Sequence, residues 1–169
     1  MIVVADASPF VALVKIGHAD VLPRMFGNVV IPPEVRDELQ RTTQAQAVQR
    51  FAASAPAWLI VKEAPVVEYI PGLDAGERAA ISLARSLPAD VLLIDETLGR
   101  QAAMECGIPT VRTGAILRDA ADVGVLDDLA SAFARLKATN FRIPHHLLDA
   151  MLERHLTLKR KSQDEFGLR

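Results

Sequence analysis

Two aspartates stand directly after short apolar runs in this sequence. Asp6 follows Ile-Val-Val-Ala, and Asp95 follows Val-Leu-Leu-Ile. Such runs are typical of strands buried on both faces of a parallel sheet, where ligands bind beyond the carboxyl ends of the strands. Two carboxylates at one edge of an apolar sheet lose hydration and repel each other, so a bound cation is the simplest compensation. A site made only of carboxylates favours Mg²⁺ or Mn²⁺.

Each aspartate also has a purely structural interpretation. Asp95 could cap the helix that follows it, although Thr97 competes for that position. The same interpretation is weaker for Asp6, because Ser8-Pro9 already has the pattern of an N-cap followed by proline in the first turn. We therefore expect Ser8 to be the N-cap, which leaves the Asp6 carboxylate available for another role.

Two glutamates could complete such a site. Glu77 stands three residues after Asp74, which is the spacing of a capping box and places Glu77 in the first turn of a helix. Glu77 therefore either closes the box or faces a metal. Glu38 lies one turn after Glu34 on a charged helical segment, where a solvent-facing position is the ordinary interpretation. Spacing alone does not assign Glu38 to a site.

Other chemistries find little support in the residues. The sequence contains no G-x-S-x-G, no phosphate-binding P-loop and no G-x-G-x-x-G fingerprint. The four histidines lack zinc-site spacing, and Cys106 precedes a turn, where a small buried side chain is the better interpretation than a nucleophile. The aromatic content of 5% is low for a surface that stacks single-stranded bases.

The elements that must position these acids alternate along the chain. Strands are expected at residues 2–5, 28–31, 58–61, 91–94 and 110–112, and a loop at 63–72. Helices are expected at residues 9–16, 34–41, 42–55, 74–87, 97–106, 114–123, 126–137 and 144–155. Apolar strands that alternate with helices predict an α/β fold with a mainly parallel sheet and helices on both faces.

The composition indicates one globular domain. Half of the 169 residues are hydrophobic, and 19 basic against 21 acidic residues give a net charge of −2. That balance argues against coating nucleic acid, or binding a membrane surface, by charge alone. One cysteine excludes an intramolecular disulfide framework, and we expect a cytoplasmic protein without a signal peptide or membrane span. Residues 157–169, which include Lys159 and Lys161, are interpreted as a solvated basic tail or a backbone-contacting arm.

Four ordered segments resemble the PIN-domain proteins. They are VADASPFVAL, VIPPEVRDEL, GLDAGERAAISLA and LLIDETLGRQAA, and a later segment, NFRIPHHLLDAML, is similar to the prokaryotic branch of predicted nucleic-acid-binding proteins. The resemblance covers roughly residues 2–155. It implies a three-layer α/β/α sandwich around a mainly parallel sheet, with a PIN-like domain over residues 1–156 and the basic tail beyond it.

The resemblance also implies a function and a site. PIN domains of this type are typically Mg²⁺- or Mn²⁺-dependent endoribonucleases, and many are toxins of toxin–antitoxin pairs. A homodimer, an RNA substrate and a small antitoxin partner are the implied partners. Ser8 and Thr113 match hydroxyl residues of the family pattern. The implied catalytic and metal-binding quartet consists of Asp6, Glu38, Glu77 and Asp95.

One departure from the family pattern concerns the last strand. The family often shows Gly-Thr there, whereas this chain has Arg112-Thr113-Gly114. Arg112 could clamp a phosphate or neutralise the acidic cluster, and Arg100 is a second local cation for RNA. An inactive PIN-like module that binds nucleic acid or protein is the alternative function. A phosphatase with Asp6 as nucleophile would need an acid where Ser8 stands.

Overall fold

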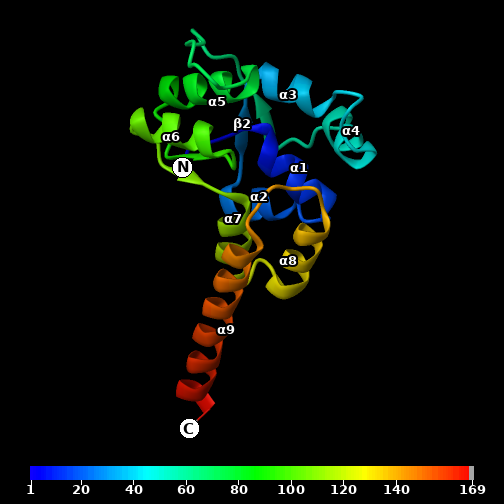
Figure 1. The fold of residues 1–169 in the computed structure, drawn as a ribbon, viewed down its shortest axis with the longest axis vertical. Helices are drawn as coiled ribbons and strands as arrows, with labels where there is room; N and C mark the ends of the chain where they lie inside the picture. Colours follow the sequence, from blue (N-terminus) through cyan, green and yellow to red (C-terminus); the bar gives the residue numbers. More distant parts are fainter. Residues whose placement is uncertain (168–169) are drawn as a thin grey trace. The chain divides into compact units, whose positions relative to one another are not determined.

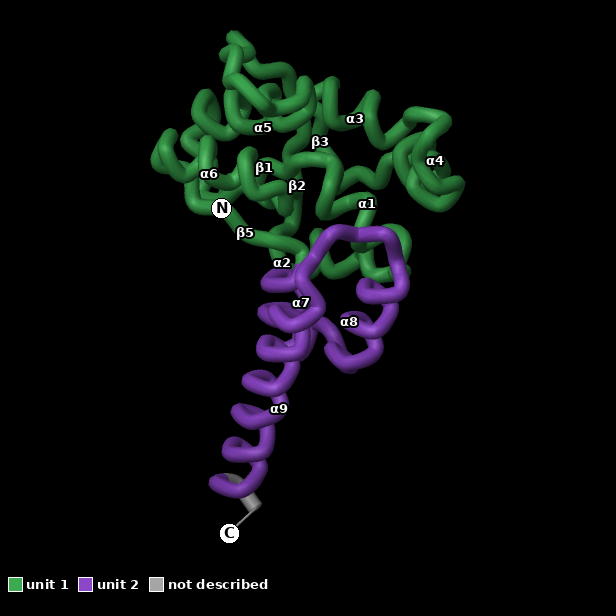
Figure 2. The backbone as a smooth tube through the Cα atoms, in the orientation of Figure 1, with its two compact units in different colours: residues 1–113 green, residues 114–169 purple. Residues whose placement is uncertain are grey.

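The computed structural model describes residues 1–167, and the chain divides into two compact units, residues 1–113 and 114–169 (Figures 1 and 2). The first unit contains one five-stranded sheet with the order β3-β2-β1-β4-β5, and every pair of neighbouring strands is parallel. The expectation of an α/β fold with a parallel sheet is confirmed. The strands are β1 (Val3–Ala5), β2 (Val29–Ile31), β3 (Leu59–Val61), β4 (Val91–Leu93) and β5 (Thr110–Val111).

The register of the central strands brings their carboxyl ends to one edge. Ala5 of β1 is paired with Leu93 of β4, and the Asp6 amide donates to the Leu93 carbonyl at 2.9 Å. On the other side of β4, the Ile94 amide donates to the Val111 carbonyl at 3.1 Å. The residues that follow β1, β4 and β5 therefore leave the sheet side by side.

Six helices flank this sheet in the first unit. Helix α5 packs against β1 and β4 and contacts both α3 and α6 (Figure 1). Five of the six lie at positions that the sequence predicted. Helix α2 was not predicted, because no hydrophobic periodicity indicated it. Their bounds are α1 (Ala7–Lys15), α2 (Val21–Phe26), α3 (Pro33–Leu39), α4 (Gln46–Ala53), α5 (Ala75–Ser86) and α6 (Thr97–Glu105).

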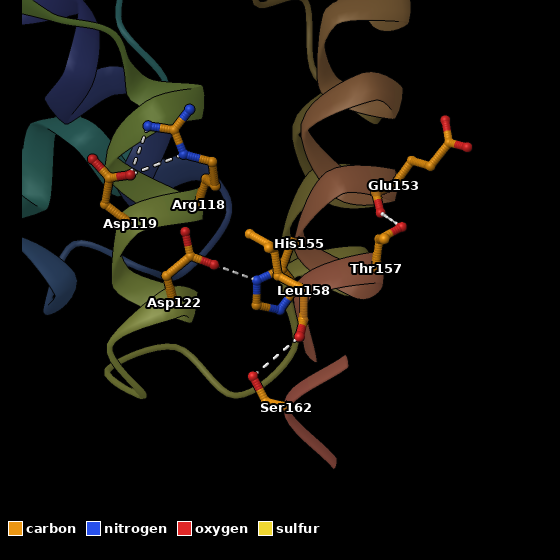
Figure 3. Close-up of polar contacts among 8 residues, drawn as sticks. All are labelled: Arg118, Asp119, Asp122, Glu153, His155, Thr157, Leu158 and Ser162. Atoms are coloured by element: carbon orange, nitrogen blue, oxygen red, sulfur yellow. Dashed lines mark hydrogen bonds and ion pairs between the residues drawn. The ribbon is translucent and has the colours of Figure 1, made fainter. Parts of the chain in front are cut away.

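The second unit is helical and consists of α7 (Thr113–Asp122), which begins at the last residue of the first unit, α8 (Leu129–Ala138) and α9 (His145–Gly167). The side chain of His155 on α9 faces Asp122 on α7, with 2.6 Å between Nδ1 and Oδ1 (Figure 3). Helix α9 includes residues 157–167, which the sequence had set apart as a tail. Nothing between residues 145 and 166 breaks a helix, and the lysines and arginines there favour one.

No helix of the described chain combines the length and apolarity that crossing a membrane requires.

Candidate active site

Asp6 begins the site at the end of β1. It is the N-cap of α1, and its Oδ2 accepts hydrogen bonds from the Ser8 amide at 3.4 Å and the Ser8 hydroxyl at 3.1 Å. The prediction of Ser8 as the N-cap is therefore wrong, because Ala7 is already helical. The Ser8 hydroxyl also accepts from the amide of Asp95 at 3.3 Å. Ser8 thus connects the ends of β1 and β4.

Three carboxylates converge on Gly76, in the first turn of α5. A β-carbon at this position would lie 2.9 Å from Glu38 Oε2, 3.4 Å from Asp74 Oδ1 and 3.6 Å from Asp6 Oδ1. The three acids come from α3, the start of α5 and the end of β1. Glu38 is therefore directed towards the site and does not have the solvent-facing position that its helix had suggested. Gly76 leaves the space in which these oxygens meet.

Glu77 closes the capping box that its spacing predicted. Its Oε2 accepts from the Asp74 amide at 3.0 Å, and its own amide donates to Asp74 Oδ1 at 2.8 Å. The other carboxylate oxygen, Oε1, lies 2.9 Å from where a β-carbon on Gly99 of α6 would stand. The side chain is buried. Glu77 thus fills the space between the starts of α5 and α6.

Asp95 is held by the residue that follows the last strand. Its Oδ1 accepts from the Thr113 amide at 2.9 Å, and its Oδ2 accepts from the Thr113 hydroxyl at 2.7 Å. It does not cap the next helix, because the N-cap of α6 is Glu96. Two hydrogen bonds from one fully buried threonine fix the orientation of the Asp95 carboxylate.

Burial dominates the electrostatics of these acids. Burial, with a smaller contribution from the charge of Asp74, raises the pKa of Asp6 to about 6, although hydrogen bonds from Ala7 and Ser8 oppose the shift. Burial, followed by the charges of Asp6 and Asp74, raises the pKa of Glu38 to about 7. The positive charges and hydrogen-bond donors around this part of the site therefore do not fully compensate its carboxylates.

The other two predicted acids are shifted in the same direction. Burial and the neighbouring charges of Asp74, Asp6 and Glu96 raise the pKa of Glu77 to about 7, although a hydrogen bond from the Asp74 backbone opposes the shift. Burial raises the pKa of Asp95, while hydrogen bonds from Thr113 and the charge of Arg112 lower it in part. All four acids thus resist ionisation in the folded chain.

The donor set fits a hard divalent cation, because it consists of carboxylate oxygens whose raised pKa values leave them in need of positive charge. Among residues 1–167, however, no three acidic, histidine or cysteine side chains stand at the mutual spacing of a metal site. Asp6 and Glu38 meet at Gly76, Glu77 lies beside them in the capping box, and Asp95 connects to them through Ser8.

Sequence reasoning did not assign Asp74 to the site. It was interpreted only as a cap, yet its charge raises the pKa values of Asp6, Glu38 and Glu77. Its position three residues before Glu77 could have identified it. The start of α5 must face the end of β1 for Glu77 to reach the site, and Asp74 lies at that start. A capping aspartate carries a full charge in addition to its hydrogen bond.

An all-parallel sheet with carboxylates gathered at the ends of its central strands is the arrangement expected of a PIN domain. Residues 2–156 match the family DUF3368, described as a PIN domain, and the chain belongs to this family. PIN domains typically have a nuclease fold and bind divalent metal ions.

A comparison with solved structures supports the same fold. The chain is similar to a PilT N-terminus domain protein from the hyperthermophilic archaeon Sulfolobus solfataricus P2, with a TM-score of 0.54 and 18% sequence identity. The match covers 70% of this chain and 92% of that chain. A search of curated proteins found no match.

Proposed function

We propose that this PIN domain is a cytoplasmic, divalent-metal-dependent endoribonuclease. The observation that carries the proposal is the convergence of Glu38, Asp74 and Asp6 around Gly76, at the carboxyl ends of the sheet. Acids placed together in this way destabilise the folded chain unless a cation offsets their charge. Selection for a function explains such a cluster better than selection for stability does.

The predicted quartet of Asp6, Glu38, Glu77 and Asp95 would hold a Mg²⁺ or Mn²⁺ ion, which when bound activates water and screens the charge of the phosphodiester. Ser8 and Thr113 position this set by holding the carboxylates of Asp6 and Asp95 through their hydroxyl groups. These hydrogen bonds fix the two acids before substrate arrives.

The Glu38 carboxylate is available to bind a metal ion or to orient water. No hydrogen bond within the described chain engages it. Its Oε2 faces the space beside Gly76 together with Asp6 Oδ1. We therefore propose that Glu38 Oε2 completes the metal site or orients the attacking water.

Cleavage of a panel of structured RNAs with Mg²⁺, Mn²⁺ or EDTA tests the proposal. The parent chain should cut only with metal, and Asp6→Asn and Asp95→Asn should each lose about 100-fold or more of that activity. Asp37→Asn is the matched control, because this aspartate is the neighbour of Glu38 on α3 but is exposed and paired with Arg36. Cleavage in EDTA, or by Asp6→Asn at the parent rate, contradicts the proposal.

The sequence resemblance supports two further proposals, that the chain is the toxin of a toxin–antitoxin pair and that it forms a homodimer. Light scattering should then give twice the 18.3 kDa of one chain. Expression in a bacterial host should arrest growth, and a small antitoxin partner should restore it. Growth at the normal rate while active nuclease accumulates argues against the toxin role.

A PIN-like module that binds nucleic acid or protein without cutting is the second candidate. The observation in its favour is that no three acidic, histidine or cysteine side chains of the described chain are grouped so that they could hold a metal ion. Calorimetry with Mn²⁺ discriminates the two candidates. Absence of both metal binding and cleavage favours the module, whereas metal binding that Asp6→Asn abolishes favours the nuclease.

A further inference from the structure

Two arginines lie next to Asp95 without partners of their own. Arg112 directly follows β5, and Arg100 is in the second turn of α6. The Nε–H group of each guanidinium is buried and has no hydrogen-bond acceptor. Within the described chain, neither side chain forms a hydrogen bond or an ion pair. Buried donors without acceptors are rare in folded proteins and require an explanation.

The charges of the two guanidinium groups also oppose each other. Burial lowers the pKa of Arg100, and the charge of Arg112 lowers it further, while Asp95 opposes the shift. Asp95 is the counter-charge shared by both arginines, yet each of its oxygens already accepts a hydrogen bond from Thr113. Two like charges therefore share one carboxylate, which Thr113 already engages at both oxygens.

Four other arginines of the first unit have partners. Arg24, Arg36 and Arg85 each form an ion pair with a nearby carboxylate, and Arg78 lies over the ring of Tyr69. The pair beside Asp95 differs because a buried donor of each guanidinium group has no acceptor. What is missing is an anion with several acceptor oxygens.

We propose that Arg100 and Arg112 together bind a backbone phosphate of a nucleic-acid strand, next to the phosphodiester that is cut. This inference rests on the proposed nuclease function. A guanidinium presents its donors as a planar fork that matches two phosphate oxygens, and two such groups can share one phosphate. Because a phosphate carries no base information, the contact positions the strand without selecting a sequence.

Binding of short single-stranded RNA by the full chain in EDTA tests this proposal without cleavage. Affinity is measured by fluorescence anisotropy over a range of salt concentrations, with two unrelated sequences. Arg100→Gln and Arg112→Gln should each weaken binding several-fold for both sequences, and each should reduce the slope of log K against log salt by about 0.7. Arg112→Lys, which keeps the charge, should retain the slope.

Arg24→Gln is the matched control, since it removes an exposed arginine of the same unit that is paired with Asp20. Thermal unfolding gives a second measurement. Because neither arginine has a hydrogen bond or ion pair to lose and their charges oppose each other, their glutamine variants should unfold at or above the parent temperature. Unchanged affinity and slope in both variants, or no RNA binding by the parent chain in EDTA, overturns the proposal.

The two proposals fail separately. The binding experiment needs no metal, so its result does not depend on whether Asp6 and Asp95 support cleavage. Metal-dependent cleavage with normal RNA binding by both arginine variants would leave the nuclease standing and refute the phosphate site.

Discussion

At the scale of single residues, Gly76 matters because of the side chain that it lacks. The carboxylate oxygens of Glu38, Asp74 and Asp6 all lie within 3.6 Å of the position that its β-carbon would occupy. A methyl group there would compete for space with the acids themselves. The nearest of these oxygens belongs to the end of the Glu38 side chain, which can rotate away.

We therefore predict that Gly76→Ala separates folding from function. Alanine favours a helix over glycine by up to about 1 kcal/mol, so the free energy of unfolding should stay within about 1 kcal/mol of the parent. Metal-dependent cleavage should fall about 10- to 100-fold, because the methyl displaces the Glu38 carboxylate. Urea unfolding and initial cleavage rates measure the two effects.

A double-mutant cycle with Glu38→Gln identifies the cause of that loss. If the methyl acts through Glu38, the combined variant should be no slower than Glu38→Gln alone. Losses that multiply independently would show that Gly76 affects the reaction by another route.

At the scale of elements, the start of α5 has two tasks. Its capping box satisfies amide groups that the first turn leaves unpaired, as the Asp74–Glu77 hydrogen bonds show. The same two residues contribute negative charge to the site. The helix is thus stabilised by residues whose charge destabilises their surroundings.

Two substitutions at Asp74 should distinguish these tasks. Asn keeps an acceptor for the Glu77 amide, whereas Ala does not, and both remove the charge. We predict that Asp74→Ala is less stable than Asp74→Asn by about 1 kcal/mol, while Asp74→Asn equals or exceeds the parent. The pKa of Glu38 should fall in both variants, as carboxyl NMR titration can measure. Equal stability of the two variants would refute the capping role.

The elements with strong local signals were predicted from the sequence. Five apolar, β-branched runs gave the five strands, and proline or capping patterns marked most helix starts. Helix α2 (Val21–Phe26) was missed because it is short and has Pro23 in its first turn. Helix α9 continues past His155 because charged helix formers follow the last apolar residues, and their polarity alone had suggested a tail.

The site was predictable only in part, for a physical reason. Strand ends in a parallel sheet share an edge, so Asp6 and Asp95 could be placed together from the pattern alone. Glu38 required the family resemblance, because spacing along α3 says nothing about which helix that face meets. Glu38 on α3 and Asp74 at the start of α5 come together only through the packing of the two helices. The effect of the Asp74 charge on the site therefore could not be predicted from the sequence.

At the scale of the whole molecule, the site should affect stability as a function of pH. The pKa of Asp6 is about 6 in the folded chain against 3.8 ordinarily, so between these values the folded chain binds more protons than the unfolded chain. Stability contributed by protonated Asp6 is therefore complete below about pH 4 and is lost as the pH rises towards about 6. Glu38 and Glu77 act in the same direction up to about pH 7.

We predict that Asp6→Asn reveals this contribution in EDTA. The variant should match the parent in stability near pH 4 and exceed it by about 3 kcal/mol above pH 6, because it cannot acquire the buried charge. Urea unfolding at several pH values measures the difference. A difference between variant and parent that stays constant with pH would contradict the prediction.

The strand order has a consequence for a chain made from its N-terminus on the ribosome. Strand β1 pairs on one side with β2 and on the other with β4. The second pairing can form only after residues 91–93 have emerged from the ribosome. Asp95 and its partner Thr113 come later still. A nascent chain that has not reached Thr113 therefore lacks the assembled site. If the protein cuts RNA, the messenger and ribosome that produce it are exposed to the activity only after Thr113 has emerged.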